Sequence, residues 1–156
     1  MRSDHKPANT GGLVVQTTGK TFEICGFPPP SSGALAIGQI LGILNNTPAG
    51  KMPLQQGLPG SEWLHFYTEA ARLAFADRAQ FVGDPDFVKA PGGNWKTMLH
   101  PTYLQQRSRL IGEQSMKMAQ AGNPAEFQTA YAPMPHQEEY GTSHISVIDR
   151  YGNAVA

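Results

Sequence analysis

Residues 34–46 (ALAIGQILGILNN) constrain the fold of this 156-residue chain more than any other stretch. Large aliphatic side chains recur at so many positions that a helix formed here is apolar nearly all round. A helix on the surface of a globular protein is apolar on one face only. The smaller Ala36, Gly38 and Gly42 lie between the large residues. The sequence therefore predicts a helix that is buried on most of its sides.

A β-hairpin is predicted before this helix, because residues 13–16 (LVVQ) and 21–26 (TFEICG) flank the short turn sequence TTGK. Polar and apolar residues alternate in the second segment, which is the period of a half-buried strand. Pro28–Pro30 cannot donate ladder hydrogen bonds, so they end the strand. Ser31 or Ser32 is then expected to supply the N-cap of the helix.

The longest predicted helix covers residues 61–82 (SEWLHFYTEAARLAFADRAQFV), with Ser61 as its N-cap. Its expected apolar stripe consists of Leu64, Tyr67, Ala71, Phe75 and Val82. Its expected solvent face consists of Glu62, His65, Glu69 and Arg72. Gly83 is expected to end the helix in the left-handed conformation, and Pro85 prevents its continuation.

The second half of the chain is predicted to consist of shorter pieces, without internal repeats. A helix is expected over residues 101–112, with Pro101 in its first turn. Residues from about 112 to 141 are polar and broken, which predicts a mostly exposed linker with at most one short helical piece. Residues 141–156 (GTSHISVIDRYGNAVA) then give an alternating strand, a turn and the start of a second strand.

The composition excludes several functional classes. The net charge is zero and the isoelectric point is about 7.0, so no electrostatic argument favours nucleic acid or a membrane surface as partner. No apolar run approaches the ~18 residues of a membrane helix, and residues 1–10 lack the apolar core of a signal peptide. The single Cys25 rules out an internal disulfide. Leu, Ile, Val and Phe form about a fifth of the chain, which is near the level at which folding alone becomes doubtful.

Two short motifs are better explained as structural features than as ligand sites. TTGKT resembles the end of a phosphate-binding loop, but that motif needs a glycine at position 14, where the chain has Val14. A hairpin turn is the better interpretation. The run Pro28–Pro30 could bind an adaptor domain. Its place between a strand and an apolar helix favours a structural break instead.

No metal site or cofactor is predicted. His65 and Glu69 lie one helical turn apart, but two ligands leave a zinc site incomplete. Asp84 and Asp86 lie in a loop that lacks the further oxygen ligands of a calcium site. A solvated helix face and a helix-ending turn are the simpler explanations.

Thr142 is the one candidate for catalysis, and two interpretations of it stay open on the residues alone. It starts a strand, as many threonines do. Alternatively, cleavage between Gly141 and Thr142 would make it an N-terminal nucleophile. Its free α-amine would then serve as the general base, since such an amine has a pKa of about 8. A small preceding residue and a polar segment before it meet the demands of that chemistry.

Three blocks of the chain resemble the γ-glutamyltransferase (γ-glutamyltranspeptidase) family in order and spacing. The first is PPPSSGALAIGQILGIL, in which Ala34 replaces the usual second glycine. The second is EAARLAFADRAQFVGDPDFV. The third is GTSHISVIDRYGNAVA, in which Ser143 stands where a second threonine is common. The resemblance extends over nearly the whole chain, from about Thr10 onward.

The resemblance implies an α/β fold that belongs to a four-layer αββα N-terminal-nucleophile hydrolase, of which this chain holds a part. It places the nucleophile and the self-cleavage site at Thr142 and the Gly141–Thr142 bond. Residues 1–141 would be the C-terminal part of a large subunit. Residues 142–156 would be the first strands of a small subunit, and the two subunits would form a heterodimer. A periplasmic or extracellular location is also implied.

The implied activity is γ-glutamyl transfer and hydrolysis, with glutathione as donor and water or an amino acid as acceptor. No cofactor is needed. Ser143 would point away from Thr142 on a strand, whereas His144 would share its face; His144 is expected to be structural, and no substrate-binding residue is assigned. The alternatives are a related acylase that acts on β-lactam side chains or polyglutamate, and a non-catalytic remnant. The chain on its own is expected to be inactive.

Overall fold

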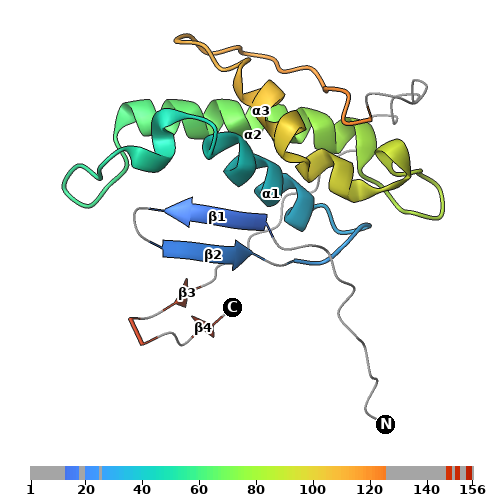
Figure 1. Cartoon of the computed structure of the whole chain (residues 1–156), viewed down its shortest axis with the longest axis horizontal. Coiled ribbons are helices and arrows are strands. Elements are labelled where there is room, and N and C mark those ends of the chain that lie inside the picture. The colour runs from blue at the N-terminus through green and yellow to red at the C-terminus, as the bar shows by residue number, and fades with distance from the viewer. Residues whose placement is uncertain are drawn as a thin grey trace.

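The computed structural model describes residues 13–17, 20–24, 26–125, 147–148, 150–151 and 154–155. Its centre is formed by three helices, α1 (Gly33–Leu44), α2 (Ser61–Phe81) and α3 (Pro101–Ser108). α1 contacts both other helices, and α2 is the longest of them (Figure 1). Three short 3-10 turns connect the helices: η1 (Pro48–Lys51), η2 (Pro91–Gly93) and η3 (Trp95–Leu99).

Both predicted hairpins are present. β1 (Leu13–Thr17) pairs antiparallel with β2 (Lys20–Ile24), and this hairpin lies beside α1 (Figure 1). β3 (Val147–Ile148) pairs antiparallel with β4 (Ala154–Val155). The described residues therefore combine helices with two two-stranded sheets. The four-layer sandwich stays a prediction, because these hairpins alone do not form its sheets.

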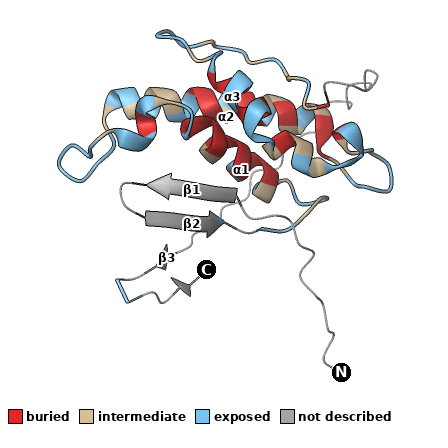
Figure 2. Cartoon of the chain, viewed as in Figure 1, coloured by how far each residue is buried: buried red, intermediate tan, exposed pale blue. Residues whose placement is uncertain are grey.

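α1 is buried on most of its sides, as predicted. Figure 2 shows the buried residues of the three helices gathered where the helices cross. Ile43 is completely buried, whereas Ile37 is 52% exposed. The glycines allow this close packing, because a Cβ atom on Gly38 would lie only 2.9 Å from Leu99 Cδ2 and one on Gly42 would collide with Leu104.

The predicted orientation of α2 is wrong in part. Val82 is buried, Ala71 packs against the core, and Glu62 and Arg72 are exposed, all as predicted. Leu64, Tyr67 and Phe75 are 41–49% exposed, whereas Glu69, predicted on the solvent face, is 1% exposed. The residues that face the core are Glu69, Ala70, Leu73, Ala74, Asp77 and Phe81. Alanines at the contact let α1 approach α2 closely. The buried carboxylates of Glu69 and Asp77 have specific hydrogen-bond partners, which are described below. The predicted pair of Glu69 and Arg72 is present, with Arg72 Nε 3.0 Å from Glu69 Oε1.

Three predicted helix ends differ in detail. Gly60, not Ser61, is the N-cap of α2. Ser32 occupies the N-cap position of α1, but its side chain makes no capping hydrogen bond there. α2 ends at an extended Val82, and Gly83 is not in the left-handed conformation.

After α3, the chain crosses the helices without helix or strand in residues 109–125. α3 itself begins with Pro101 as predicted, but it ends at Ser108. Residues 112–122, which we call the strap, lie against α2 and α3 and form part of the orange trace in Figure 1. Residues 112–125 contain no helical piece, and Ala125 is buried. Residues 126–141 of the predicted linker lie outside the described residues.

Among the described residues, no helix has the length and apolar character needed to cross a membrane.

Candidate functional site

The predicted nucleophile Thr142 and the predicted cleavage site Gly141 lie outside the described residues, as do Ser143 and His144. The described residues that follow them most closely are those of β3. The assignment of Thr142 therefore stays a prediction. The structure instead shows how the first two of the three family-like sequence blocks are held together.

Those two blocks meet through side chains. Gln39 of α1 donates from Nε2 to Asp77 Oδ2 of α2 at 2.8 Å. Arg78, the next residue of α2, donates from Nε to Ser32 Oγ at 2.8 Å. The serine that was expected to cap α1 therefore binds α2 instead. The adjacent Asp77 and Arg78 each hold a different part of the first block.

Asp77 is the centre of a buried polar network and is completely inaccessible to solvent. Its Oδ2 accepts from Gln39 Nε2 at 2.8 Å and from the Tyr103 hydroxyl at 2.7 Å. Its Oδ1 accepts from the Gly122 backbone N–H at 2.8 Å and lies 3.0 Å from Arg107 Nη2. The network therefore connects α1, α2, α3 and the strap through one carboxylate.

This network is suited to structure and not to proton transfer. A carboxylate offers about four lone-pair sites, and Asp77 has four donors. Burial, together with the negative charge of Asp77, raises the pKa of Tyr103 well above its ordinary value, so the hydroxyl stays protonated and keeps donating. Arg107 balances the buried charge and also donates to the backbone oxygens of Leu73 and Gln120.

Asp77 was not among the site residues predicted from the sequence, although a local signal existed. Leu73, Ala74 and Phe81 stand three or four positions from it, so they share its helix face. A carboxylate on such a face must have buried partners. Those partners lie 26–45 positions away in the sequence, so the helix pattern alone could not identify them.

A second buried carboxylate, Glu69, holds the strap. Its Oε2 accepts from the Met116 N–H at 2.8 Å, and its Oε1 accepts from Ser115 Oγ and Arg72 Nε at 3.0 Å each. Burial by itself raises the pKa of Glu69. The hydrogen bonds from Met116 and Ser115 and the contact with Arg72 outweigh burial, so the pKa is lowered overall.

The residues of the two possible metal sites that were considered have other roles in the structure. Glu69 is used by the strap, and His65 Nε2 donates to the Gly112 carbonyl at 2.7 Å. Asp84 Oδ1 accepts from the Asp86 N–H at 2.9 Å, which is the geometry of a turn. Within the described part of the chain, no group of three or more His, Cys, Asp or Glu residues could hold a metal ion.

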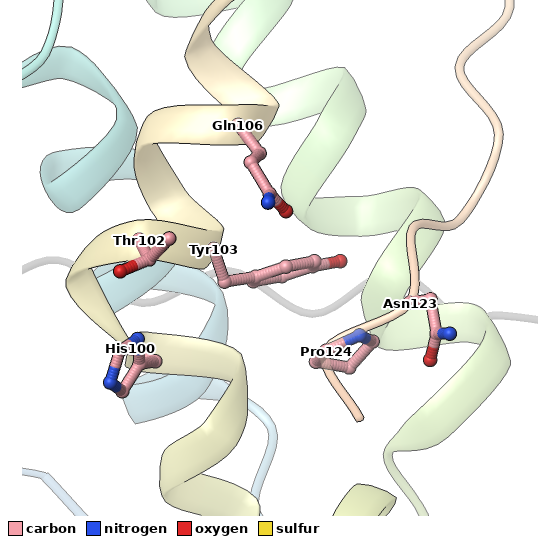
Figure 3. A pocket seen from close by; sticks show the side chains of 6 residues that line it. All are labelled: His100, Thr102, Tyr103, Gln106, Asn123 and Pro124. Atoms are coloured by element: carbon pink, nitrogen blue, oxygen red, sulfur yellow. The ribbon is translucent and has the colours of Figure 1, made fainter. Parts of the chain in front are cut away.

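One open depression lies between α3 and the segment after the strap (Figure 3). Its volume is about 200 Å³, below the ~300 Å³ of the smallest usual ligand pockets. Tyr103 lines it, but the hydroxyl of this residue is already bonded to Asp77. The remaining lining residues are His100, Thr102, Gln106, Asn123 and Pro124. The depression is therefore not a candidate catalytic site.

Comparison with known proteins identifies the family. A family model described as gamma-glutamyltranspeptidase matches residues 4–156. The chain is 34% identical to a glutathione hydrolase proenzyme of Bacillus subtilis and 35% identical to one of Escherichia coli. It is 33% identical to an acylase ACY 1 proenzyme of a Pseudomonas species. Each match covers 86% of this chain but only 21–23% of the relative.

Two solved structures have a similar fold. The gamma-glutamyltranspeptidase of Helicobacter pylori superimposes with a TM-score of 0.57 at 24% identity, over 78% of this chain and 32% of the other. That of Pseudomonas nitroreducens superimposes with a TM-score of 0.53 at 28% identity, over 67% and 29%. The chain thus spans about a fifth to a third of the proteins that it matches. Since the family model extends over almost all of its residues, the chain belongs to the gamma-glutamyltranspeptidase family.

Proposed function

We propose that this chain is part of a γ-glutamyl hydrolase and transferase whose nucleophile is Thr142. The observation that carries the proposal is the family match, which runs through residue 156 and so includes the Gly141–Thr142 junction. The similar proteins of B. subtilis and E. coli are named glutathione hydrolase proenzymes. Glutathione is therefore the proposed donor, and water or an amino acid the proposed acceptor.

The proposed division of the chain follows from the same junction. Residues 1–141 would belong to the large subunit and residues 142–156 to the small subunit of one heterodimer. The name proenzyme, used for the relatives, supports a maturation step by cleavage. The four-layer αββα architecture would be formed by the two subunits together, with the three helices of Figure 1 in the large one.

Maturation would begin when the Thr142 hydroxyl attacks the carbonyl carbon of Gly141. The peptide C–N bond breaks, the Thr142 nitrogen takes up a proton, and an ester joins the two residues. Water then hydrolyses the ester, which leaves a carboxylate on Gly141 and a free hydroxyl and α-amine on Thr142. The amine is positioned to act as general base for its own hydroxyl.

Turnover would repeat the same chemistry on substrate. Thr142 Oγ attacks the γ-carbonyl of the donor, and the amine of the departing group receives the proton. The γ-glutamyl group is then held as an ester on Thr142. Water releases glutamate, or an amino-acid amine forms a new γ-glutamyl amide, which is acyl transfer in two half-reactions. Both tetrahedral intermediates need an oxyanion hole, for which the described residues supply no candidate.

A related acylase is the second candidate, because a similar chain is named acylase ACY 1 proenzyme. The two candidates share the nucleophile and the maturation step. They differ in the acyl group that the mature site accepts.

Activity assays separate the candidates. The full-length precursor should hydrolyse a γ-glutamyl anilide after maturation, and added dipeptide acceptor should give γ-glutamyl product. Thr142→Ala should abolish both reactions, and Glu62→Gln, a surface change on α2, should leave them intact. Turnover of an acyl-β-lactam without any turnover of the anilide would favour the acylase. The 156-residue chain alone should be inactive. If it is active, and Thr142→Ala removes this activity, then the hypothesis that it is only a part of the enzyme is wrong.

A further inference from the structure

The strap is held by its backbone. Met116 N–H and Gly122 N–H donate to Glu69 and Asp77. Carbonyl oxygens of the strap accept from side chains of α2 and α3. These pairs are Gly112 with His65 Nε2 at 2.7 Å, Lys117 with Arg72 Nη1 at 2.9 Å and Gln120 with Arg107 Nη2 at 2.8 Å. The strap bends at residues 113–114 and 117–118 and has a positive φ at Lys117. It is thus bound mainly through its backbone.

The contacts follow one face of α2 in order. His65, Glu69 and Arg72 stand at spacings of four and three, which place them on one side of a helix. Asp77 follows toward the C-terminal end. The strap residues that bind them follow the same order in the sequence, from Gly112 to Gly122. The strap therefore runs parallel to α2.

The strap supplies most of the donors to a buried carboxylate of α2. Glu69 is 1% exposed, and the strap supplies two of its three donors. Without the strap, Arg72 would be the one remaining donor to Glu69 among these three. The half-buried Met116 and Ala119 pack against the helix core, whereas Met118 is 84% exposed.

We propose that the strap is a permanent anchor, with Glu69 and Asp77 as positioning residues that hold it both before and after cleavage at Thr142. This inference rests on the proposed function. Gly122 precedes Thr142 by 20 positions, and the strap contacts given above all join residues of the described range 26–125. Breaking that bond removes no hydrogen bond from Glu69 or Asp77. The segment held in this way reaches at least to Gly122, and Ala125 just beyond it is buried.

Amide hydrogen exchange tests the anchor in the full-length precursor. The protection factors of Met116 and Gly122 should agree within about twofold between the uncut Thr142→Ala protein and the mature protein, with Leu73 as the core reference. A loss of protection at both amides after the cut, with Leu73 unchanged, would overturn the proposal. If the precursor does not cut itself, a site-specific protease sequence placed at residues 136–141 supplies the cut. Failure of self-cleavage then counts against the proposed function only.

Variants test the positioning role. Ser115→Ala removes one donor to Glu69 from an exposed position, and Glu69→Gln replaces the charged acceptor. Loss of a hydrogen bond to a charged group should speed exchange at Met116 roughly tenfold or more, without an effect on Leu73. Glu62→Gln, in the exposed first turn of the same helix, should change neither. Unchanged exchange at Met116 in Ser115→Ala and in every folded Glu69 variant would refute the role of Glu69.

Discussion

Arg107 Nη2 lies 3.0 Å from Asp77 Oδ1, and both side chains are almost completely removed from solvent. A buried pair of this kind stabilises a fold little when compared with an apolar pair, but loss of one partner leaves an uncompensated charge. The pair is therefore better described as a requirement for this helix arrangement than as a source of extra stability.

Arg107→Met should destabilise the chain by about 3–5 kcal/mol, because Asp77 would keep its charge without its cation. This amount approaches the whole stability of a small domain, so the variant should lose most of its helical circular dichroism at 25 °C. Arg109→Met is the matched control, since Arg109 is exposed one residue beyond α3. A native spectrum for Arg107→Met would show that the donors Gln39, Tyr103 and Gly122 suffice for Asp77, and that the ion pair is not required.

The strap should loosen in acid. The pKa of Glu69 is lower in the folded chain than its ordinary value, so its ionised form stabilises the strap above the ordinary pKa of about 4.3. That contribution is lost as the pH falls through the lowered folded value. The protection factor of Met116 should therefore drop below about pH 4, while that of Leu73 falls less. Glu69→Gln should remove this pH dependence, and its persistence in that variant would assign it to another group.

Gly42→Ala should destabilise the helix core, because the new methyl group would collide with Leu104. Overpacking costs about 1–3 kcal/mol, and the better helix propensity of alanine offsets about 1 kcal/mol. A net loss of about 1 kcal/mol is expected in urea unfolding followed by tryptophan fluorescence. Gly50→Ala is the control, since a Cβ atom there would meet nothing within 4 Å. Equal unfolding midpoints for Gly42→Ala and wild type would show that α3 can shift at no cost.

The elements of this fold were largely predictable, but the orientation of α2 was not. Both hairpins and all three helices follow from local period and from proline and glycine. The predicted apolar stripe ran through Leu64, Tyr67 and Phe75, whereas the residues at the core include Ala70 and Ala74. Close helix packing rewards the small residues instead, and the surrounding polar groups come from distant segments. The strap is missed for the same reason, since side chains of α2 and α3 bind its backbone and its own composition is polar.

The exposed face of α2 should make the isolated chain associate. Leu64, Tyr67 and Phe75 are 47%, 41% and 49% exposed on one helix, and an apolar surface of this kind favours contact with other molecules. The 156-residue chain should sediment as a mixture whose mean mass rises with concentration. The double variant Leu64→Glu with Phe75→Lys should reduce this rise. Phe87→Lys changes an exposed aromatic residue outside α2 and should not reduce the rise. Equal effects of the double variant and of Phe87→Lys would disprove a specific role of the α2 face.

Self-cleavage should occur between Gly141 and Thr142 in the full-length precursor, with a new N-terminus that reads Thr-Ser-His-Ile. The attack is intramolecular, so its rate should not depend on precursor concentration. A hydroxyl group is required, so Thr142→Ser should still cleave, more slowly, and Thr142→Ala should stay one chain. Ser143→Ala should cleave normally, because adjacent residues of a strand project to opposite faces. Intact mass and N-terminal sequencing measure all four outcomes. Cleavage of Thr142→Ala at the same bond, or a block by Ser143→Ala alone, would mean that Thr142 is not the nucleophile.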